Sequence, residues 1–126
     1  MLELIRALVR SVGFALNGVL FAFRTQRNFR IHLIAAVSVL TAALFFRFSR
    51  LEMVLLVLTI ALVIAGELSN TALEVALNLL EARHHPVVRH AKDIAAAGVL
   101  AAVIGALGVA VLLFGPRLCR LWSALG

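Results

Sequence analysis

Three long stretches of the chain contain no Lys, Arg, Asp or Glu. They run from Ile31 to Phe46, from Met53 to Gly66 and from Ile94 to Pro116. A helix needs about 20 mostly apolar residues to cross the roughly 30 Å hydrocarbon core of a bilayer. The third stretch is long enough to span the bilayer by itself. The first is long enough if the Arg47 side chain extends to the interface, and the second is long enough if its helix continues past Glu67. The pattern predicts three membrane-spanning helices, over residues 30–47, 51–82 and 92–115.

The first 28 residues follow a different pattern, with polar side chains spread along an otherwise apolar segment. On a helical wheel five of them fall within an arc of about 60°: Glu3, Arg6, Arg10, Asn17 and Arg24. A narrow polar face opposite a wide apolar one is typical of a helix that lies in the membrane interface. No small-residue cleavage site follows, as a signal peptide would require. We therefore expect an interfacial helix over residues 3–28.

The composition agrees with a membrane protein. Apolar residues make up 63% of the 126 residues and charged residues 14%, against usual shares of about 45–50% and about 25%. A soluble domain of this size has no room to hide so much apolar surface, and a disordered chain would be far less hydrophobic. The predicted fold class is an all-α integral membrane protein, a single membrane domain over residues 1–126. Three spans make a thin bundle, so we also expect homo-oligomers.

The charges predict how the chain is oriented. There are 12 basic and 6 acidic residues, a net charge of +6. Eight of the 12 basic residues lie in the N-terminal segment and in the loop between the second and third spans, and the other four lie on the opposite side. Because Lys and Arg concentrate in cytoplasmic loops, this bias predicts a cytoplasmic N-terminus. The positive charge fits anionic lipid headgroups, and we expect no nucleic-acid partner.

Most polar residues of the second span share one face. Glu67, Asn70, Glu74, Asn78 and Glu81 fall within an arc of about 80°. A carboxylate as close to the hydrocarbon as Glu67 is costly unless it faces a polar cavity, which makes it a candidate general base. Glu74, two turns further on, is a candidate ligand for Mg²⁺. This arrangement suits phosphoryl transfer from a nucleotide to a lipid alcohol, whereas for Glu81 a solvated helix face is the favoured interpretation.

The loop before the third span places positive charge beside this stripe. It contains His84, His85, His90, Lys92 and Asp93, and phosphoryl transfer needs positive charge around the phosphates more than covalent chemistry. Lys92 also suits an interface anchor, and Asp93 suits the positive end of a helix. The histidines lack the spacing of a zinc site, and the chain has no Walker A, GxSxG or GxGxxG motif.

Three motifs carry a resemblance to a known family: RNFRIHL at Arg27–Leu33, ELSNTALE at Glu67–Glu74 and AKD at Ala91–Asp93. With them the chain resembles the prokaryotic diacylglycerol kinase and undecaprenol kinase family, and the first motif resembles its undecaprenol kinase branch. The resemblance implies a homotrimer in the bacterial inner (cytoplasmic) membrane. It also implies Mg²⁺-dependent phosphorylation of a membrane lipid alcohol, undecaprenol or diacylglycerol, with ATP as phosphoryl donor.

The resemblance further assigns roles to individual residues. Matched positions imply Glu67 as the catalytic base, Glu74 and Gln26 as metal positions, His85, Lys92 and Asp93 as nucleotide contacts, and Arg30 and Asn70 as substrate contacts. The chain departs from the pattern at Gln26 and Asn78, where many members have acidic residues. Because an amide carries no negative charge, we expect weaker Mg²⁺ binding, and a catalytically degenerate homologue is one alternative.

Two other classes of function stay open. A small oligomeric proton-coupled transporter would use Glu67 as its coupling acid, although three spans and acidic residues at one interface fit that class less well. A structural membrane subunit would not need the stripe of Glu67, Asn70 and Glu74. Formation of a lipid phosphate from labelled ATP distinguishes the kinase from both.

Overall fold

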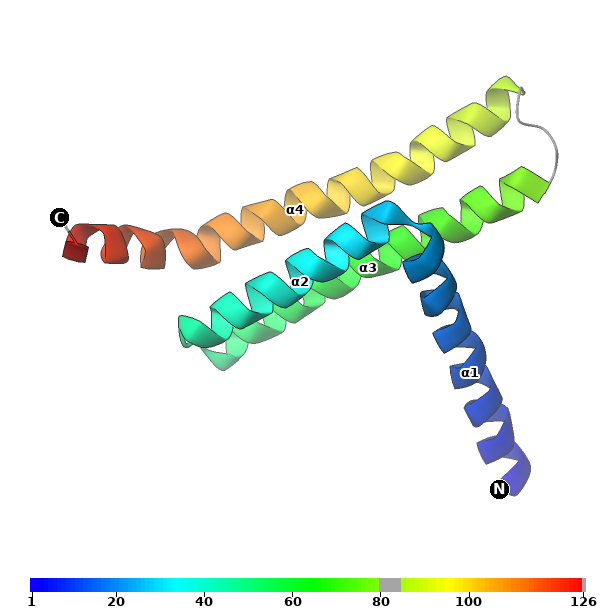
Figure 1. Cartoon of the computed structure of the whole chain (residues 1–126), viewed down its shortest axis with the longest axis horizontal. Coiled ribbons are helices and arrows are strands. Elements are labelled where there is room, and N and C mark those ends of the chain that lie inside the picture. The colour runs from blue at the N-terminus through cyan, green and yellow to red at the C-terminus, as the bar shows by residue number, and fades with distance from the viewer. Residues whose placement is uncertain (80–84, 126) are drawn as a thin grey trace.

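The computed structural model describes residues 1–79 and 85–125, and these ranges are almost entirely helical. Four helices follow one another (Figure 1): α1 (Leu2–Thr25), α2 (Arg27–Phe45), α3 (Arg50–Leu79) and α4 (Pro86–Leu125). The predicted all-α class is confirmed. Each helix is long and apolar enough to cross a membrane, judged by length and composition alone. Because α1 also meets this criterion, its place on the membrane surface stays a prediction.

Three of the helices form a bundle. Helices α2, α3 and α4 run alongside one another, whereas α1 points away from them at a steep angle (Figure 1). The buried apolar side chains are few: Ala22 comes from the end of α1, and Phe29, Ala43, Leu56, Val63 and Val99 come from the three bundle helices. Most large apolar side chains are exposed instead. Such a surface fits a chain that is surrounded by lipid or by further copies of itself.

A single extended residue separates α1 from α2. Gln26 has φ −105° and ψ 115°, and its N–H donates to the carbonyl of Ala22 at 2.8 Å. The helix expected over residues 3–28 therefore ends three residues earlier, because one residue in extended conformation interrupts the helical hydrogen bonding. Ala22 and Phe29 on either side of the break are buried, with 0% and 1% exposure. The chain therefore changes direction between α1 and α2 at a packed junction that contains neither proline nor glycine.

The bundle helices overlap the predicted spans, but their ends differ from the prediction. Helix α2 stops at Phe45 rather than at residue 47, and Arg47 has φ 53°, a left-handed conformation typical of helix ends. Helix α3 is described as far as Leu79. The predicted end of this span at residue 82, together with Glu81 and His84, lies outside the described residues.

Helix α4 is much longer than the span predicted over residues 92–115. It begins at Pro86, where a proline is well tolerated because the first helical N–H has no intrahelical partner, and it continues through Pro116 to Leu125. Its 40 residues correspond to about 60 Å, twice the roughly 30 Å core of a bilayer. The predicted span is therefore the middle of a helix that extends at both ends.

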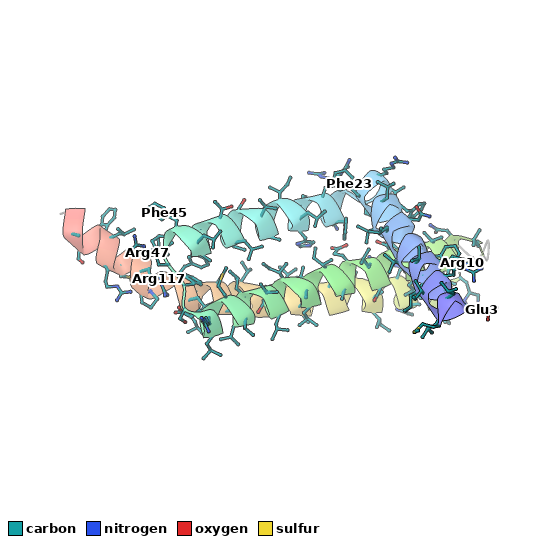
Figure 2. All side chains as sticks on the ribbon, turned by 90° about the horizontal axis from the view of Figure 1, so that it is seen from below. Glu3, Arg10, Phe23, Phe45, Arg47 and Arg117 are labelled. Atoms are coloured by element: carbon teal, nitrogen blue, oxygen red, sulfur yellow. The ribbon has the colours of Figure 1, made fainter. Side chains whose placement is uncertain are left out.

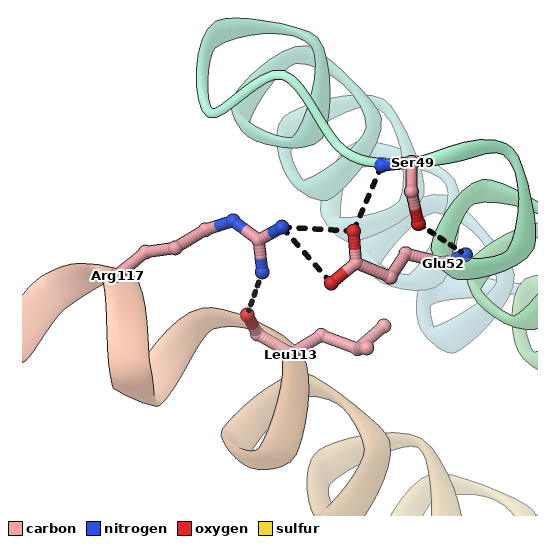
Figure 3. Close-up of polar contacts among 4 residues, drawn as sticks. All are labelled: Ser49, Glu52, Leu113 and Arg117. Atoms are coloured by element: carbon pink, nitrogen blue, oxygen red, sulfur yellow. Dashed lines mark hydrogen bonds and ion pairs between the residues drawn. The ribbon is translucent and has the colours of Figure 1, made fainter.

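A polar cluster joins the start of α3 to α4. The Ser49 N–H donates to Glu52 Oε2 at 2.8 Å, and the Glu52 N–H donates to Ser49 Oγ at 3.4 Å, a reciprocal helix cap. Arg117 of α4 donates from Nη2 to both Glu52 oxygens, at 2.9 and 2.8 Å, and from Nη1 to the Leu113 carbonyl at 2.7 Å (Figure 3). Its guanidinium also lies 4.3 Å from the ring centroid of Phe48. Glu52 thus has a structural role in this contact.

Charged side chains lie toward the ends of the molecule. Figure 2 shows Glu3 and Arg10 on α1 at one end and Arg47 and Arg117 at the other. Between these ends, the stretch of α2 from Ile31 onward has no Lys, Arg, Asp or Glu. An uncharged zone between two charged ends is the distribution that a membrane-spanning bundle requires.

Candidate active site

A buried carboxylate lies at the centre of the candidate site. Glu67 on α3 is 4% exposed, and its Oε1 lies 3.1 Å from Nε2 of His32 on α2. The Thr71 hydroxyl donates its hydrogen bond to the backbone carbonyl of Glu67 at 2.8 Å, and not to the carboxylate. A buried charge is costly without a partner, and here the partner comes from a neighbouring helix. Glu67 therefore faces the interior of the bundle.

A cavity of about 350 Å³ lies beside this pair, between α2, α3 and α4. Its polar lining comes from Asn28 and His32 on α2 and from Glu67 and Asn70 on α3. Apolar side chains of α4, including Leu100, form the opposite wall. The volume falls within the usual range of small-molecule sites, roughly 300–1,000 Å³. A reacting group therefore has room beside the carboxylate.

A second, apolar cavity of about 160 Å³ lies along the same three helices. Small side chains such as Ala35 and Ala36 on α2 contribute to its lining. The hydroxyl of Thr59, which also lines it, donates to its own helix at the Leu55 carbonyl, at 2.6 Å. His32 borders both cavities. The imidazole thus marks the junction between a polar space and an apolar one.

Asn70 and Glu74 form the next part of the site. Asn70 Nδ2 donates to Glu74 Oε1 at 3.4 Å, and Asn70 Oδ1 is buried with no partner among the described residues. The opposite amide orientation would place Oδ1 against the carboxylate, two acceptors facing each other. One end of the amide is therefore satisfied, and the other end presents an unpaired oxygen, which is uncommon for a buried polar atom.

These oxygens fit the chemistry of Mg²⁺. This cation prefers oxygen ligands and is commonly held by one or two carboxylates together with the phosphates of a substrate. Glu74 supplies one carboxylate and Asn70 one amide oxygen. Over residues 1–79 and 85–125 no group of three His, Cys, Asp or Glu residues is placed to hold a metal by itself. The donor set fits a cation that arrives with a nucleotide.

Lys92 connects the acidic stripe of α3 to α4. Its Nζ donates to Asn78 Oδ1 at 2.8 Å. Lys92 is half-buried, and the contact holds its ammonium group one turn beyond Glu74 on the stripe. The sequence identified Asn78 as a departure from the family pattern, and the structure shows that the amide positions a cation.

The other four predicted site residues differ in their exposure and in their hydrogen bonds. Gln26 is half-buried at the break between α1 and α2, while Arg30 and Asp93 are exposed. His85 is also exposed, and its Nδ1 accepts a hydrogen bond from the Val87 N–H at 3.3 Å. Within the described part of the chain, no hydrogen bond or ion pair joins these four predicted site residues to Glu67 or Glu74.

Two residues that line the polar cavity, Asn28 and His32, were not among the predicted site residues. Both lie in the RNFRIHL segment, and their spacing of four residues places them on one face of α2. That spacing was a usable signal, but only the contact between α2 and α3 shows which face meets Glu67. Gly66 was missed as well: a Cβ atom there would lie 3.8 Å from Val99 Cγ2, so α4 packs closely beside the site.

Comparison with known proteins gives a consistent picture. The family model described as prokaryotic diacylglycerol kinase matches residues 13–114. A diacylglycerol kinase of Synechocystis sp. is 43% identical over 115 residues, which cover 90% of this chain and 66% of that relative, slightly less than two thirds of its length. An undecaprenol kinase of Bacillus subtilis is 34% identical over 102 residues, covering 81% of this chain and 83% of the relative. A diacylglycerol kinase of Pseudomonas aeruginosa is 29% identical over 93 residues, covering 74% and 76%.

Proposed function

The chain belongs to the prokaryotic diacylglycerol kinase family, as its motifs predicted, and we propose that it transfers the γ-phosphoryl group of ATP to the hydroxyl of a membrane lipid alcohol. Undecaprenol is the first candidate substrate and diacylglycerol the second. The observation that carries the proposal is the buried carboxylate of Glu67, which borders a cavity of about 350 Å³. A catalytic base needs this combination of a fixed position and access for the reacting hydroxyl.

In the proposed reaction Glu67 takes the proton of the lipid hydroxyl. The hydroxyl oxygen forms a bond to the γ-phosphorus while the bond from that phosphorus to the β-bridging oxygen breaks, so that ADP leaves and a lipid phosphate forms. Such a reaction depends mainly on positioning and on neutralising charge around the phosphates. Glu67 serves the first requirement, because its carboxylate is fixed between two helices.

Positive charge at the phosphates comes from two sources in this proposal. Glu74 would hold Mg²⁺, which neutralises phosphate charge when it is bound, and Gln26 would add an uncharged oxygen. Asn70, whose Oδ1 is unpaired, would contact the substrate. Lys92, held by Asn78 at 2.8 Å, would contact the nucleotide phosphates. His85 and Asp93 would contact the rest of the nucleotide, and Arg30 the lipid headgroup.

The apolar cavity supports a substrate with a hydrocarbon chain. It has a volume of about 160 Å³, and His32 and Val103 line both this cavity and the polar one. A lipid alcohol with its chain in the apolar cavity would present its hydroxyl on the Glu67 side. A water-soluble alcohol would leave this apolar space unused.

Purified protein tests the proposal directly. Incubation with γ-labelled ATP and Mg²⁺ in mixed micelles that contain either undecaprenol or diacylglycerol is expected to yield labelled lipid phosphate. The lipid with the higher kcat/KM identifies the substrate. Absence of labelled lipid with both alcohols, in protein that still binds ATP, would contradict the proposed function and favour the degenerate homologue.

We also propose a homotrimer in the bacterial inner membrane, with a cytoplasmic N-terminus and α1 on the membrane surface. The exposed apolar surface of α2–α4 supports further chains around this thin bundle. Cys119 tests the topology, because it is the single cysteine and it is exposed on α4. With a cytoplasmic N-terminus and three spans, Cys119 lies outside the cytoplasm. A membrane-impermeant maleimide should therefore label it in spheroplasts. Labelling only after lysis would contradict the combination of three spans and a cytoplasmic N-terminus. The mass of the purified complex tests the trimer.

A further inference from the structure

We infer that His32 is a positioning residue for Glu67: its imidazole orients one carboxylate oxygen so that the other is available to the substrate hydroxyl. This inference rests on the proposed function of Glu67 as a base. Nothing in the motifs or in the family relationship described above assigns a role to His32. The evidence is the 3.1 Å separation between His32 Nε2 and Glu67 Oε1, across two helices.

The imidazole is the one side-chain partner of the Glu67 carboxylate within residues 1–79 and 85–125. The nearby Thr71 hydroxyl donates to the backbone carbonyl of Glu67 instead, and Asn70 Nδ2 donates to Glu74. Without His32, the carboxylate would be buried with no described donor, free to change rotamer. In the inferred arrangement the hydrogen on His32 Nε2, which lies 3.1 Å from Glu67 Oε1, is donated to that oxygen and Oε2 is left as the remaining acceptor.

Burial makes this contact effective. The side chains of His32 and Glu67 are 21% and 5% exposed, so water competes little for the hydrogen bond. A charge-assisted hydrogen bond is stronger than a neutral one, and it is strengthened further in a surrounding of low dielectric constant. The same bond also joins α2 to α3, so an experiment must separate positioning of the carboxylate from simple tethering of the helices.

The position of His32 fits a role at the reacting group. It borders both the polar cavity that contains Glu67 and the apolar cavity. A hydroxyl at the end of a hydrocarbon chain would therefore meet the carboxylate where the imidazole holds it.

Two substitutions of His32 separate the roles. H32L removes the donor and keeps an apolar side chain of moderate size, whereas H32Q keeps an amide N–H at a reach similar to that of imidazole Nε2. We expect H32L to lower kcat on the order of 10-fold to 100-fold, with the KM for ATP unchanged, since misplacement of a catalytic group acts on the chemical step. We expect H32Q to stay within about 3-fold of the unchanged protein, because it restores the donor. I34L, which introduces a leucine two residues further along α2 at an exposed position, is the matched control.

A readout without turnover accompanies the kinetics. In protein labelled with ¹⁵N-histidine, the His32 Nε2 signal is assigned by its loss in H32Q, and it should shift in E67Q because the charge of its acceptor is removed. An unshifted signal, or an H32L kcat equal to that of I34L, would overturn the inference. Equal losses in H32Q and H32L would also overturn it, since the donor would then not matter. Absence of lipid phosphate in the unchanged protein would instead remove the proposed function, and the NMR shift would still test the pairing.

Discussion

Replacing Leu56 by alanine tests how the bundle is held together, because this leucine is buried at 4% exposure on α3. In a water-soluble core such a change costs about 2–5 kcal/mol, of which about 2.4 kcal/mol is the transfer of three carbon groups out of water at about 0.8 kcal/mol each. Lipid chains are as apolar as a leucine, so in a membrane the transfer contribution disappears. The free-energy cost of losing the packing contacts remains, and we expect a destabilisation of about 1–2 kcal/mol.

Leu58 provides the matched control. It lies two residues further along the same helix and is 62% exposed, so Leu58→Ala is expected to change the free energy of unfolding by less than about 0.5 kcal/mol. Unfolding of both variants by SDS in mixed micelles, followed by the fluorescence of the single tryptophan, Trp122, gives the two values. Equal effects of the two substitutions would refute the role of packing around Leu56. A loss above about 4 kcal/mol for Leu56→Ala would refute the reasoning that a leucine of the unfolded chain is surrounded by lipid and not by water.

Three further predictions address the polar contacts. Arg117→Gln should lower the SDS midpoint more than Arg120→Gln, because Arg117 bonds to Glu52 and to a helix carbonyl whereas Arg120 is exposed; equal midpoints would contradict the role of the cluster. Lys92→Met should raise the KM for ATP on the order of 10-fold through loss of a charged hydrogen-bond donor, as measured by initial rates at varied ATP; an unchanged KM would separate Lys92 from the nucleotide. Gln26→Glu should lower the Mg²⁺ concentration for half-maximal rate, because a carboxylate binds this cation more strongly than an amide; a Mg²⁺ titration with no shift would place Gln26 away from the metal.

The helices were predictable from the sequence because their signal is local. A run without charged residues, such as Ile94 to Pro116, predicts a membrane helix whatever it packs against. The burial of Glu67 also followed from local reasoning, since a carboxylate next to a long apolar run must find a polar surrounding. The ends were less predictable: Gln26 carries no turn signal, and α4 continues through Pro116, a residue that more often ends a helix.

The contacts across helices required the structure. His32 was visible in the sequence, but nothing along the chain indicates that it faces Glu67, 35 positions later, rather than lipid. The pairing of Lys92 with Asn78 depends in the same way on how α3 and α4 pack. For Arg30 and Asp93, family resemblance predicted roles that the contacts of the described chain neither support nor oppose, because both side chains are exposed.

The central claim is that the carboxylate of Glu67 accepts the proton of a lipid hydroxyl. The most direct measurement compares the unchanged protein with Glu67→Gln in the transfer of label from γ-labelled ATP to the lipid, at saturating ATP and lipid. Glutamine keeps the shape and one oxygen acceptor toward His32 but is not a base. The account predicts a loss of kcat on the order of 100-fold or more, with ATP binding retained. A Glu67→Gln protein with near-normal kcat would contradict it.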